Sequence, residues 1–402
     1  MFYGWRMVGV AFGANFVASG LGFYALPKLM LPLAEEFTDG DRGPVALLVA
    51  AMSLAGFVVS PLVGQLLTRH SLKRMMPLAA VVMGLGFLAV SQATALWHLI
   101  VVYATTVPIG VITLSAIGAN TLVANWFDRV RPFALGVSQF GLSISGAVVA
   151  YFISWTLGLG GWQTTYAMLG GVAIAVSPLL FVSIVDRPAA RGLSVDGEPP
   201  PVGKSAPTPP PWSFAEALRD RNLWLAGMTA GLCFAGATAM IQNAYALAMD
   251  AGHTDTQANF VLVALSVGAA FGKLLFGALG VRIGEKASLA CAVVGEALFL
   301  ALLPAAAESA TLLAGVGFGL GITLGGVMPA LAALIARLHG ASRFAAAMGY
   351  VGPMMIPFQI LGAPAAAYAF DRTGSYDLAI YGFVIACGLA LLLLLQIRTV
   401  PD

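Results

Sequence analysis

Charged residues are scarce in this chain of 402 residues. Asp, Glu, Lys and Arg together make up 9% of it, whereas hydrophobic residues make up 59%. A soluble domain needs far more charge than this to cover its surface. The low charge and the mean hydropathy of +0.89 therefore indicate a membrane protein.

Cysteine and histidine are also rare. The three cysteines (Cys233, Cys291 and Cys387) lie inside apolar runs without pair spacing, which is typical of helix-packing residues and not of disulfides or metal ligands. The four histidines are scattered and form no metal set, and no phosphate loop, nucleophile triad or basic-aromatic nucleic-acid patch is present. We therefore expect no enzyme activity, no cofactor, no metal and no nucleic-acid partner.

Long apolar runs recur along the whole sequence. Each is near the ~20 residues that cross a bilayer as a helix, and the runs are continuous, unlike the alternating pattern of a membrane barrel. This pattern predicts an all-α polytopic membrane protein with twelve transmembrane helices, over residues 8–33, 44–67, 75–94, 97–123, 134–157, 162–184, 222–248, 257–279, 287–306, 309–336, 344–368 and 377–397.

The basic residues predict the orientation of these spans. An even number of spans puts both termini on one side, and 16 of the 20 Lys and Arg residues fall on that side. Because basic loops stay in the cytoplasm, we expect both termini to be cytoplasmic, in the cell (inner) membrane.

The longest loop divides the chain into two parts. Its centre, residues 197–211, is rich in proline and nearly free of apolar residues, which predicts an extended linker. Ser213 and Glu216 then form a capping-box pattern that favours a short interfacial helix. We expect an N-terminal six-helix bundle over 1–186, a cytoplasmic linker over 187–220 and a C-terminal six-helix bundle over 221–402.

Two hairpins repeat with an offset of 213 residues. Gly64-Gln65-Leu66 with Arg69 and Lys73 returns as Gly277-Ala278-Leu279 with Arg282 and Lys286, and Ala134-Leu135-Gly136 returns as Ala347-Met348-Gly349. One shift that matches separate segments indicates an internal duplication, which is typical of transporters whose substrate site lies between two halves.

This layout resembles the major facilitator superfamily. The repeated hairpins are similar to its loop signature G-x-L-a-D-R-x-G-R-K, although Thr68 and Val281 stand where aspartate is usual and Ser71 replaces a glycine. The resemblance implies that the basic residues near these loops belong to a cytoplasmic gate. They are Arg69, Lys73, Arg129, Arg131, Arg282 and Lys286.

Three stretches are similar to one branch of that superfamily, the monocarboxylate transporters and their bacterial relatives, including oxalate–formate exchangers. They are Tyr3-Gly4-Trp5-Arg6, Tyr24-Ala25-Leu26-Pro27-Lys28 and Trp126–Gly141. The third matches the aromatic-Phe-x-basic-x-basic pattern of the branch and is the most specific of them.

Lys273 is the strongest candidate for substrate binding. A lysine inside the hydrocarbon region costs about 2.5–3.5 kcal/mol and normally faces a bundle interior or a partner. The small residues Gly268, Ala269, Gly272 and Gly277 favour close helix packing beside it. The resemblance implies that it replaces an arginine that holds the substrate carboxylate, with the charge kept and the bidentate fork lost. The alternative is a lysine that snorkels to the interface.

Three further ionisable residues are candidates for a proton or anion relay. The resemblance implies this role for Lys28, and the alternative is an interfacial anchor. Glu296 lies within the ninth predicted span, where a buried structural carboxyl is the alternative to a proton-coupling group. Asp250 ends the seventh span, where a solvated loop acid is the alternative.

Uncharged polar residues within the spans are candidates to line the substrate cavity. They are Asn15, Asn120, Gln139, Asn243 and Tyr350, with Ser143 and Gln242 as further members. Such side chains hydrogen-bond either a substrate or a neighbouring helix. The sequence thus favours a monomeric secondary transporter of a small organic monocarboxylate anion, with a proton as co-substrate. The alternatives are an efflux carrier for amphipathic drugs or larger organic acids, an anion exchanger, and a non-transporting sensor of the same fold.

Overall fold

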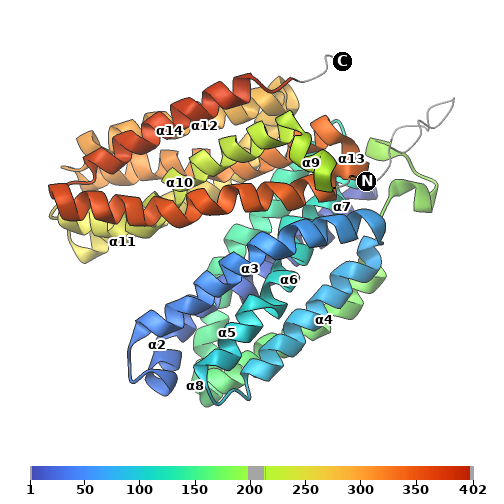
Figure 1. The fold of residues 1–402 in the computed structure, drawn as a ribbon, viewed down its shortest axis with the longest axis horizontal. Helices are drawn as coiled ribbons and strands as arrows, with labels where there is room; N and C mark the ends of the chain where they lie inside the picture. The colour runs from blue at the N-terminus through green and yellow to red at the C-terminus, as the bar shows by residue number, and fades with distance from the viewer. Residues whose placement is uncertain (1, 198–211, 213, 399–402) are drawn as a thin grey trace. The chain divides into compact units, whose positions relative to one another are not determined.

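The computed structural model describes residues 2–197, 212 and 214–398. Within these residues every regular element is a helix, and ten helices are long and apolar enough to cross a membrane (Figure 1). This confirms the all-α membrane fold predicted from the apolar runs.

The first third of the chain contains the first four spans. The first is made of α1 (Gly4–Ser19), the π-helical turn η1 (Gly20–Tyr24) and α2 (Leu26–Phe37). The next two are α3 (Arg42–Arg69) and α4 (Leu72–Val90), and the fourth is assembled from α5 (Leu96–Ala104), α6 (Thr106–Val111), the π-helical turn η2 (Ile112–Ala116) and α7 (Gly118–Trp126).

Two very long helices each contain two spans. The 53 residues of α8 (Arg131–Ser183) would extend for about 80 Å, far more than the ~30 Å hydrocarbon core. The helix is broken at Gly160 and Gly161, where Gly161 has a φ of 71° that favours glycine. The 64 residues of α13 (Ala310–Thr373) break in the same way at Gly340, with a φ of 71°. With these two breaks the ten long helices supply the twelve predicted spans.

The remaining helices complete the second part of the chain. Two short 3₁₀ turns, η3 (Pro188–Arg191) and η4 (Val195–Gly197), follow α8. After them come α9 (Phe214–Arg219), α10 (Arg221–Asp250), α11 (Asp255–Ile283), α12 (Glu285–Ala306) and α14 (Asp377–Leu395). The short helix α9 lies where a short helix was predicted, and its interfacial position stays a prediction. Ser213 and residues 198–211 of the predicted linker lie outside the described residues.

Helix ends follow ordinary capping chemistry. The carboxylate of Asp220 accepts a hydrogen bond from the backbone N–H of Leu223 at the start of α10, at 2.8 Å. Thr254 and Gln257 form a reciprocal capping box at the start of α11. These caps lie at the polar ends of apolar spans.

Contacts divide the chain into two compact units. The first contains residues 1–128, 141–212 and 341–353, and the second contains residues 129–140, 213–340 and 354–402. The start of α8 therefore packs with the second unit, and the middle of α13 packs with the first. The division into bundles at residues 187–220 stays a prediction.

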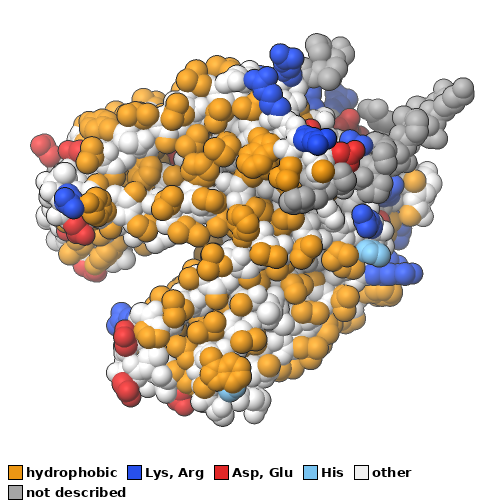
Figure 2. All heavy atoms as spheres, in the orientation of Figure 1, with side chains coloured by type: hydrophobic (Ala, Val, Ile, Leu, Met, Phe, Trp, Pro, Cys, Tyr) orange, Lys and Arg blue, Asp and Glu red, His pale blue; other side chains and the backbone are white. Residues whose placement is uncertain are grey.

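The surface of the helices has the chemistry of a protein in lipid. Hydrophobic side chains cover the lengths of the helices, and charged side chains gather at their ends (Figure 2). Exposed examples are Leu54 and Val58 on α3 and Leu389 and Leu392 on α14. The buried interior of both units is also mostly apolar, so the helices are hydrophobic on most sides, as expected of membrane spans.

Candidate functional site

Lys273 lies deep within α11. It is ten residues before Ile283, the last residue of the helix, which is about 15 Å at 1.5 Å per residue. The helix ends four residues later than predicted and carries Arg282 on its last turn. This extra length puts Lys273 farther from the helix end than the sequence alone indicated.

Glycines hold α11 against α13 beside this lysine. A Cβ atom built on Gly268 would collide with the carbonyl oxygen of Phe318, and one on Gly272 would collide with that of Ile322. From the other helix, Gly321 and Gly325 of α13 lie against carbonyl oxygens of the α11 backbone. The close helix packing predicted for the small residues near Lys273 is confirmed, and it fixes the backbone that carries the lysine.

The first turns of α8 lie on the same stretch of α11. Gly136 packs against the carbonyl oxygen of Lys273, and a Cβ atom placed on it would be 3.5 Å from the Cα of Gly277. A Cβ on Gly277 would be 2.8 Å from the carbonyl oxygen of Pro132. Gln139, on the same turns of α8, is 4% exposed. The predicted residues Lys273 and Gln139 therefore belong to adjacent segments of the second unit.

The same contact is repeated in the first unit, 213 residues away. A Cβ on Gly64 of α3 would be 2.6 Å from the carbonyl oxygen of Ala345, and one on Gly349 would be 2.7 Å from that of Ser60. The contact of Gly64 with Ala345 is the counterpart of that of Gly277 with Pro132. The contact of Gly349 with Ser60 is the counterpart of that of Gly136 with Lys273. The duplication therefore preserves residue-to-residue packing, not only a loop motif.

Tyr350 lies beside this repeated contact. The side-chain amide of Gln65 donates a hydrogen bond to the Tyr350 hydroxyl, with a distance of 2.6 Å between Nε2 and the oxygen. Tyr350 is buried, and both residues belong to the first unit. The partner of Tyr350 is thus a residue of the repeated hairpin motif.

Asn15 and Asn120 are buried in the first unit. The hydroxyl of Ser115, in the π-helical turn η2, donates to Oδ1 of Asn15 at 2.7 Å. Ser19 donates to the carbonyl oxygen of Asn15 at 2.6 Å, and its hydroxyl lies 2.9 Å from that of Ser145 on α8. Asn120 donates to the carbonyl oxygen of Ala116 at 2.9 Å. Sequence reasoning found the asparagines but missed the serines and the π-helical turns, for which the sequence carries no periodic signal.

The predicted relay residues are divided between the two units. The Lys28 amine donates to the hydroxyl of Ser154 at 2.9 Å in an exposed position of the first unit. In the second unit, the Tyr376 hydroxyl donates to Asp250 at 3.3 Å. Burial raises the pKa of Tyr376, and the negative charges of Asp250 and Asp371 raise it further. Asn243, on the same helix as Asp250, donates to the carbonyl oxygen of Ala239 at 2.9 Å.

Glu296 is fully buried between α10, α12 and α14. Among the described residues, neither carboxyl oxygen has a hydrogen-bond partner. Gly236 leaves room for the carboxyl, since a Cβ there would be 3.3 Å from Oε1. The buried thiols of Cys233 and Cys387 lie beside it. An ionised carboxylate is very costly to bury in such a place.

The predicted gate residues lie at the helix ends. Arg69, Arg129 and Arg282 are exposed, whereas Arg131 is 6% exposed. The backbone N–H of Lys73 donates to Oδ1 of Asp186 at 2.9 Å, and the Lys286 amine donates to the carbonyl oxygens of Leu395 and Ile397 at 3.0 and 2.7 Å. These lysines therefore link helix ends within their own units.

Two of the sequence patches that carry the branch resemblance are in contact. The ring centroids of Tyr3 and Trp126 are 5.5 Å apart, and those of Trp5 and Phe127 are 5.2 Å apart. The guanidinium of Arg191 lies 4.1 Å from the centre of the Tyr3 ring. The start of the chain, the end of α7 and η3 thus form one aromatic cluster.

No group of three His, Cys, Asp or Glu side chains in the part of the chain that the structure describes has the arrangement of a metal site. In the second unit, Lys273 lies within a span among packed glycines, with Gln139 on the adjacent turns of α8.

Comparison with known proteins gives one family over the whole chain. The model of the Major Facilitator Superfamily matches residues 1–252 and 228–402. The mouse protein Monocarboxylate transporter 11 is 26% identical over 394 residues, which cover 93% of this chain and 83% of the mouse protein. Human Monocarboxylate transporter 2 is 23% identical over 93% of this chain and 81% of its own length.

Solved structures share the fold. A bacterial homologue of the iron transporter ferroportin superimposes with a TM-score of 0.75, 12% identity and coverage of 98% of this chain and 99% of the other. The fucose:proton symporter of E. coli gives a TM-score of 0.72, 16% identity and coverage of 99% and 98%. The chain is a multi-pass membrane transporter and not an enzyme. By this match along its full length, the chain belongs to the major facilitator superfamily.

Proposed function

We propose that this protein is a secondary active transporter of a small organic monocarboxylate anion, with a proton as co-substrate. In this proposal Lys273 is the counter-charge of the substrate carboxylate, and both termini are cytoplasmic in the cell (inner) membrane. The proposal also takes the protein to act as a monomer.

The position of Lys273 carries the proposal. Its Cα is about 15 Å along the helix from Ile283, and a lysine within a span normally faces a bundle interior or a binding partner. A substrate carboxylate would be such a binding partner during transport. The names of the related monocarboxylate transporters support the same substrate class.

The residue type sets the expected selectivity. Lysine offers a compact charge with three rotatable donors, whereas arginine presents a planar fork. A lysine site holds one carboxylate without imposing a fixed geometry, so we expect several small monocarboxylates to compete for it. One deep cation favours a monoanion over a dianion.

Alternating access is supported by the paired glycine contacts. Two backbone contacts join segments from different halves of the repeat: Gly136 packs on Lys273, and Gly349 packs on Ser60. Smooth glycine surfaces allow such backbones to approach closely and to separate without breaking side-chain interactions. Rocking of the halves would make and release both contacts in each cycle.

Uptake into proteoliposomes tests the function. The purified protein is reconstituted, and an inward proton gradient drives uptake of labelled lactate, pyruvate or formate. We expect uptake that follows the gradient and that collapses when a protonophore removes it. Exchange against internal oxalate without any need for a gradient would indicate the exchanger, and transport of amphipathic drugs alone would indicate the efflux carrier.

A further inference from the structure

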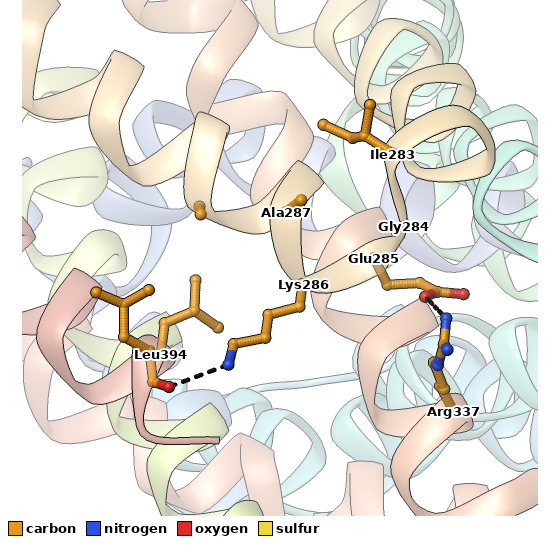
Figure 3. Close-up of a pocket in the computed structure, with 9 residues that line it drawn as sticks. Ile283, Gly284, Glu285, Lys286, Ala287, Arg337 and Leu394 are labelled. Carbon is orange, nitrogen blue, oxygen red and sulfur yellow. Dashed lines mark hydrogen bonds and ion pairs between the residues drawn. The ribbon is translucent and has the colours of Figure 1, made fainter. Parts of the chain in front are cut away.

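A pocket lies where α12 begins and α14 ends, away from Lys273. It has a volume of about 440 Å³ and is lined by residues from the end of α11 and the turn after it, from α12, from α13 and from α14: Ile283, Gly284, Glu285, Lys286, Ala287, Ala290, Arg337, Leu394 and Leu395. Figure 3 shows Lys286 extending toward the end of α14 and Arg337 pointing toward Glu285. All of these residues belong to the second unit.

The pocket combines positive charge with an apolar wall. Arg337 forms an ion pair with Glu285, with 3.1 Å between Nη1 and Oε2. Lys286 uses two of its three donors on backbone carbonyls of the α14 end. The carbonyl partners carry no formal charge, so the pocket keeps one net positive charge beside the side chains of Ile283 and Leu394. This chemistry suits an anion with an apolar tail.

The first half of the repeat contains a built-in anion at the matching place. Lys73 corresponds to Lys286, and its backbone N–H binds the carboxylate of Asp186 at 2.9 Å. Shifted by 213 residues, Asp186 becomes Thr399, which is not acidic, and Ala124 becomes Arg337. In sequence, the second half thus has a neutral residue in place of Asp186 and gains two residues of opposite charge, Glu285 and Arg337, which pair with each other.

We propose that this pocket binds the phosphate headgroup of an anionic phospholipid, with the acyl chain along the apolar wall. Basic pockets between membrane helices bind anionic headgroups by this combination of charges and apolar surface. The pocket is formed by the ends of membrane-spanning helices, which places it near the headgroup region in this proposal. A bound lipid would tie the α14 end to α12 and to the end of the first span within α13.

Native mass spectrometry and thermal unfolding of the purified protein in neutral detergent test the proposal. The probes are phosphatidylglycerol, phosphatidylcholine and soluble glycerol phosphate. We expect retention of phosphatidylglycerol and a raised melting temperature with that lipid alone. Equal retention of phosphatidylcholine, or equal stabilisation by glycerol phosphate, would overturn the assignment of an anionic lipid.

Matched variants locate the site. Removal of one cation in Lys286→Gln or Arg337→Gln should weaken phosphatidylglycerol binding about five-fold, whereas Lys73→Gln, the counterpart in the first half, should leave it unchanged. Arg337→Gln keeps a hydrogen-bond donor for Glu285, and lipid-free melting temperatures show whether each variant is folded. Unchanged lipid binding in folded Lys286→Gln and Arg337→Gln would overturn the proposal.

Discussion

Gly136 lies directly against the backbone carbonyl of Lys273. The residue proposed to hold the substrate is therefore also a packing partner of the first turns of α8. The counterpart contact, Gly349 on Ser60, has the same geometry but no charge. The two repeats therefore share this backbone contact, but only the second has a charged residue at it.

Substitution of Gly136 by alanine should impair transport. A methyl group there would collide with the carbonyl oxygen of Lys273, and overpacking of this kind costs about 1–3 kcal/mol. If the strain falls on one state of the transport cycle, the population of that state drops about 5- to 150-fold. Initial rates of uptake in proteoliposomes measure the effect.

Gly349→Ala should behave in the same way, since its added Cβ would be 2.7 Å from the Ser60 oxygen. Gly171→Ala is the matched control, because no atom lies within 4 Å of the place that its added Cβ would take. Normal uptake by Gly136→Ala and Gly349→Ala at wild-type expression would show that these contacts are not part of the cycle.

The hydrogen bond between Gln65 and Tyr350 should appear as an energetic coupling. Tyr350→Phe and Gln65→Ala each remove it, so the double variant should lose less stability than the sum of the two, with a coupling of about 1 kcal/mol. Thermal unfolding of the four proteins measures the cycle. Gln65→Ala combined with the distant Gln92→Ala should be additive. Strict additivity of Gln65→Ala and Tyr350→Phe would mean that the bond contributes nothing.

Asp220 should make stability depend on pH in the acid range. Burial raises its pKa, but hydrogen bonds from His339 and from the N–H of Leu223, together with the attraction of His339, outweigh it and lower the pKa below its ordinary value. Its Oδ2 is 3.4 Å from Nε2 of His339. A lowered carboxyl pKa contributes stability that is complete above the unfolded value of about 4 and is lost as the pH falls through the folded value.

Two variants separate charge from capping at Asp220. Asp220→Ala should cost about 1 kcal/mol at pH 7 through loss of the helix cap, whereas Asp220→Asn keeps a cap and loses only the charge. The difference in melting temperature between wild type and Asp220→Asn should shrink as the pH falls below about 4, where the carboxyl of Asp220 takes up its proton. A difference that grew as the pH fell below about 4 would contradict this account.

Glu296 should tolerate neutral replacement. Its carboxyl is buried and has no hydrogen-bond partner among the described residues, so an apolar residue of similar shape removes a desolvation cost. Glu296→Met should melt at or above the wild-type temperature, whereas Glu296→Ala should lose about 2 kcal/mol or more by leaving a cavity. Thermal unfolding measures both.

The same variants decide whether Glu296 takes part in proton coupling. As a structural group, it should leave the pH dependence of uptake unchanged in Glu296→Met. Gradient-independent uptake by a stable Glu296→Met protein would assign the coupling proton to this carboxyl.

Much of the fold could be predicted from the sequence because continuous apolar runs near bilayer length leave few alternatives to a spanning helix. The positions at which the helices end were less predictable. The helix α11 continues through Arg282 to Ile283, beyond the apolar run, because hydrogen bonding and not hydropathy ends a helix. The π-helical turns η1 and η2 follow from tertiary packing and leave no periodic pattern.

The site was less predictable than the fold. Lys273 was found because a charge inside an apolar run is conspicuous. The partner of Tyr350 was not found, because Gln65 is 285 residues away in sequence and only packing brings the two together. The repeat offset predicted that Gly136 and Gly349 are equivalent. It did not predict that Gly136 packs on the backbone of Lys273 and Gly349 on the backbone of Ser60.

The most direct test of the central claim is the dependence of monocarboxylate uptake on the charge at position 273. Wild type, Lys273→Arg, Lys273→Gln and the lipid-facing control Leu275→Ala are compared in proteoliposomes under one proton gradient. We predict that Lys273→Gln loses at least about 90% of uptake, that Lys273→Arg retains part of it with altered substrate preference, and that Leu275→Ala matches wild type. Wild-type uptake by Lys273→Gln would contradict the assignment of Lys273 as the counter-charge of the substrate.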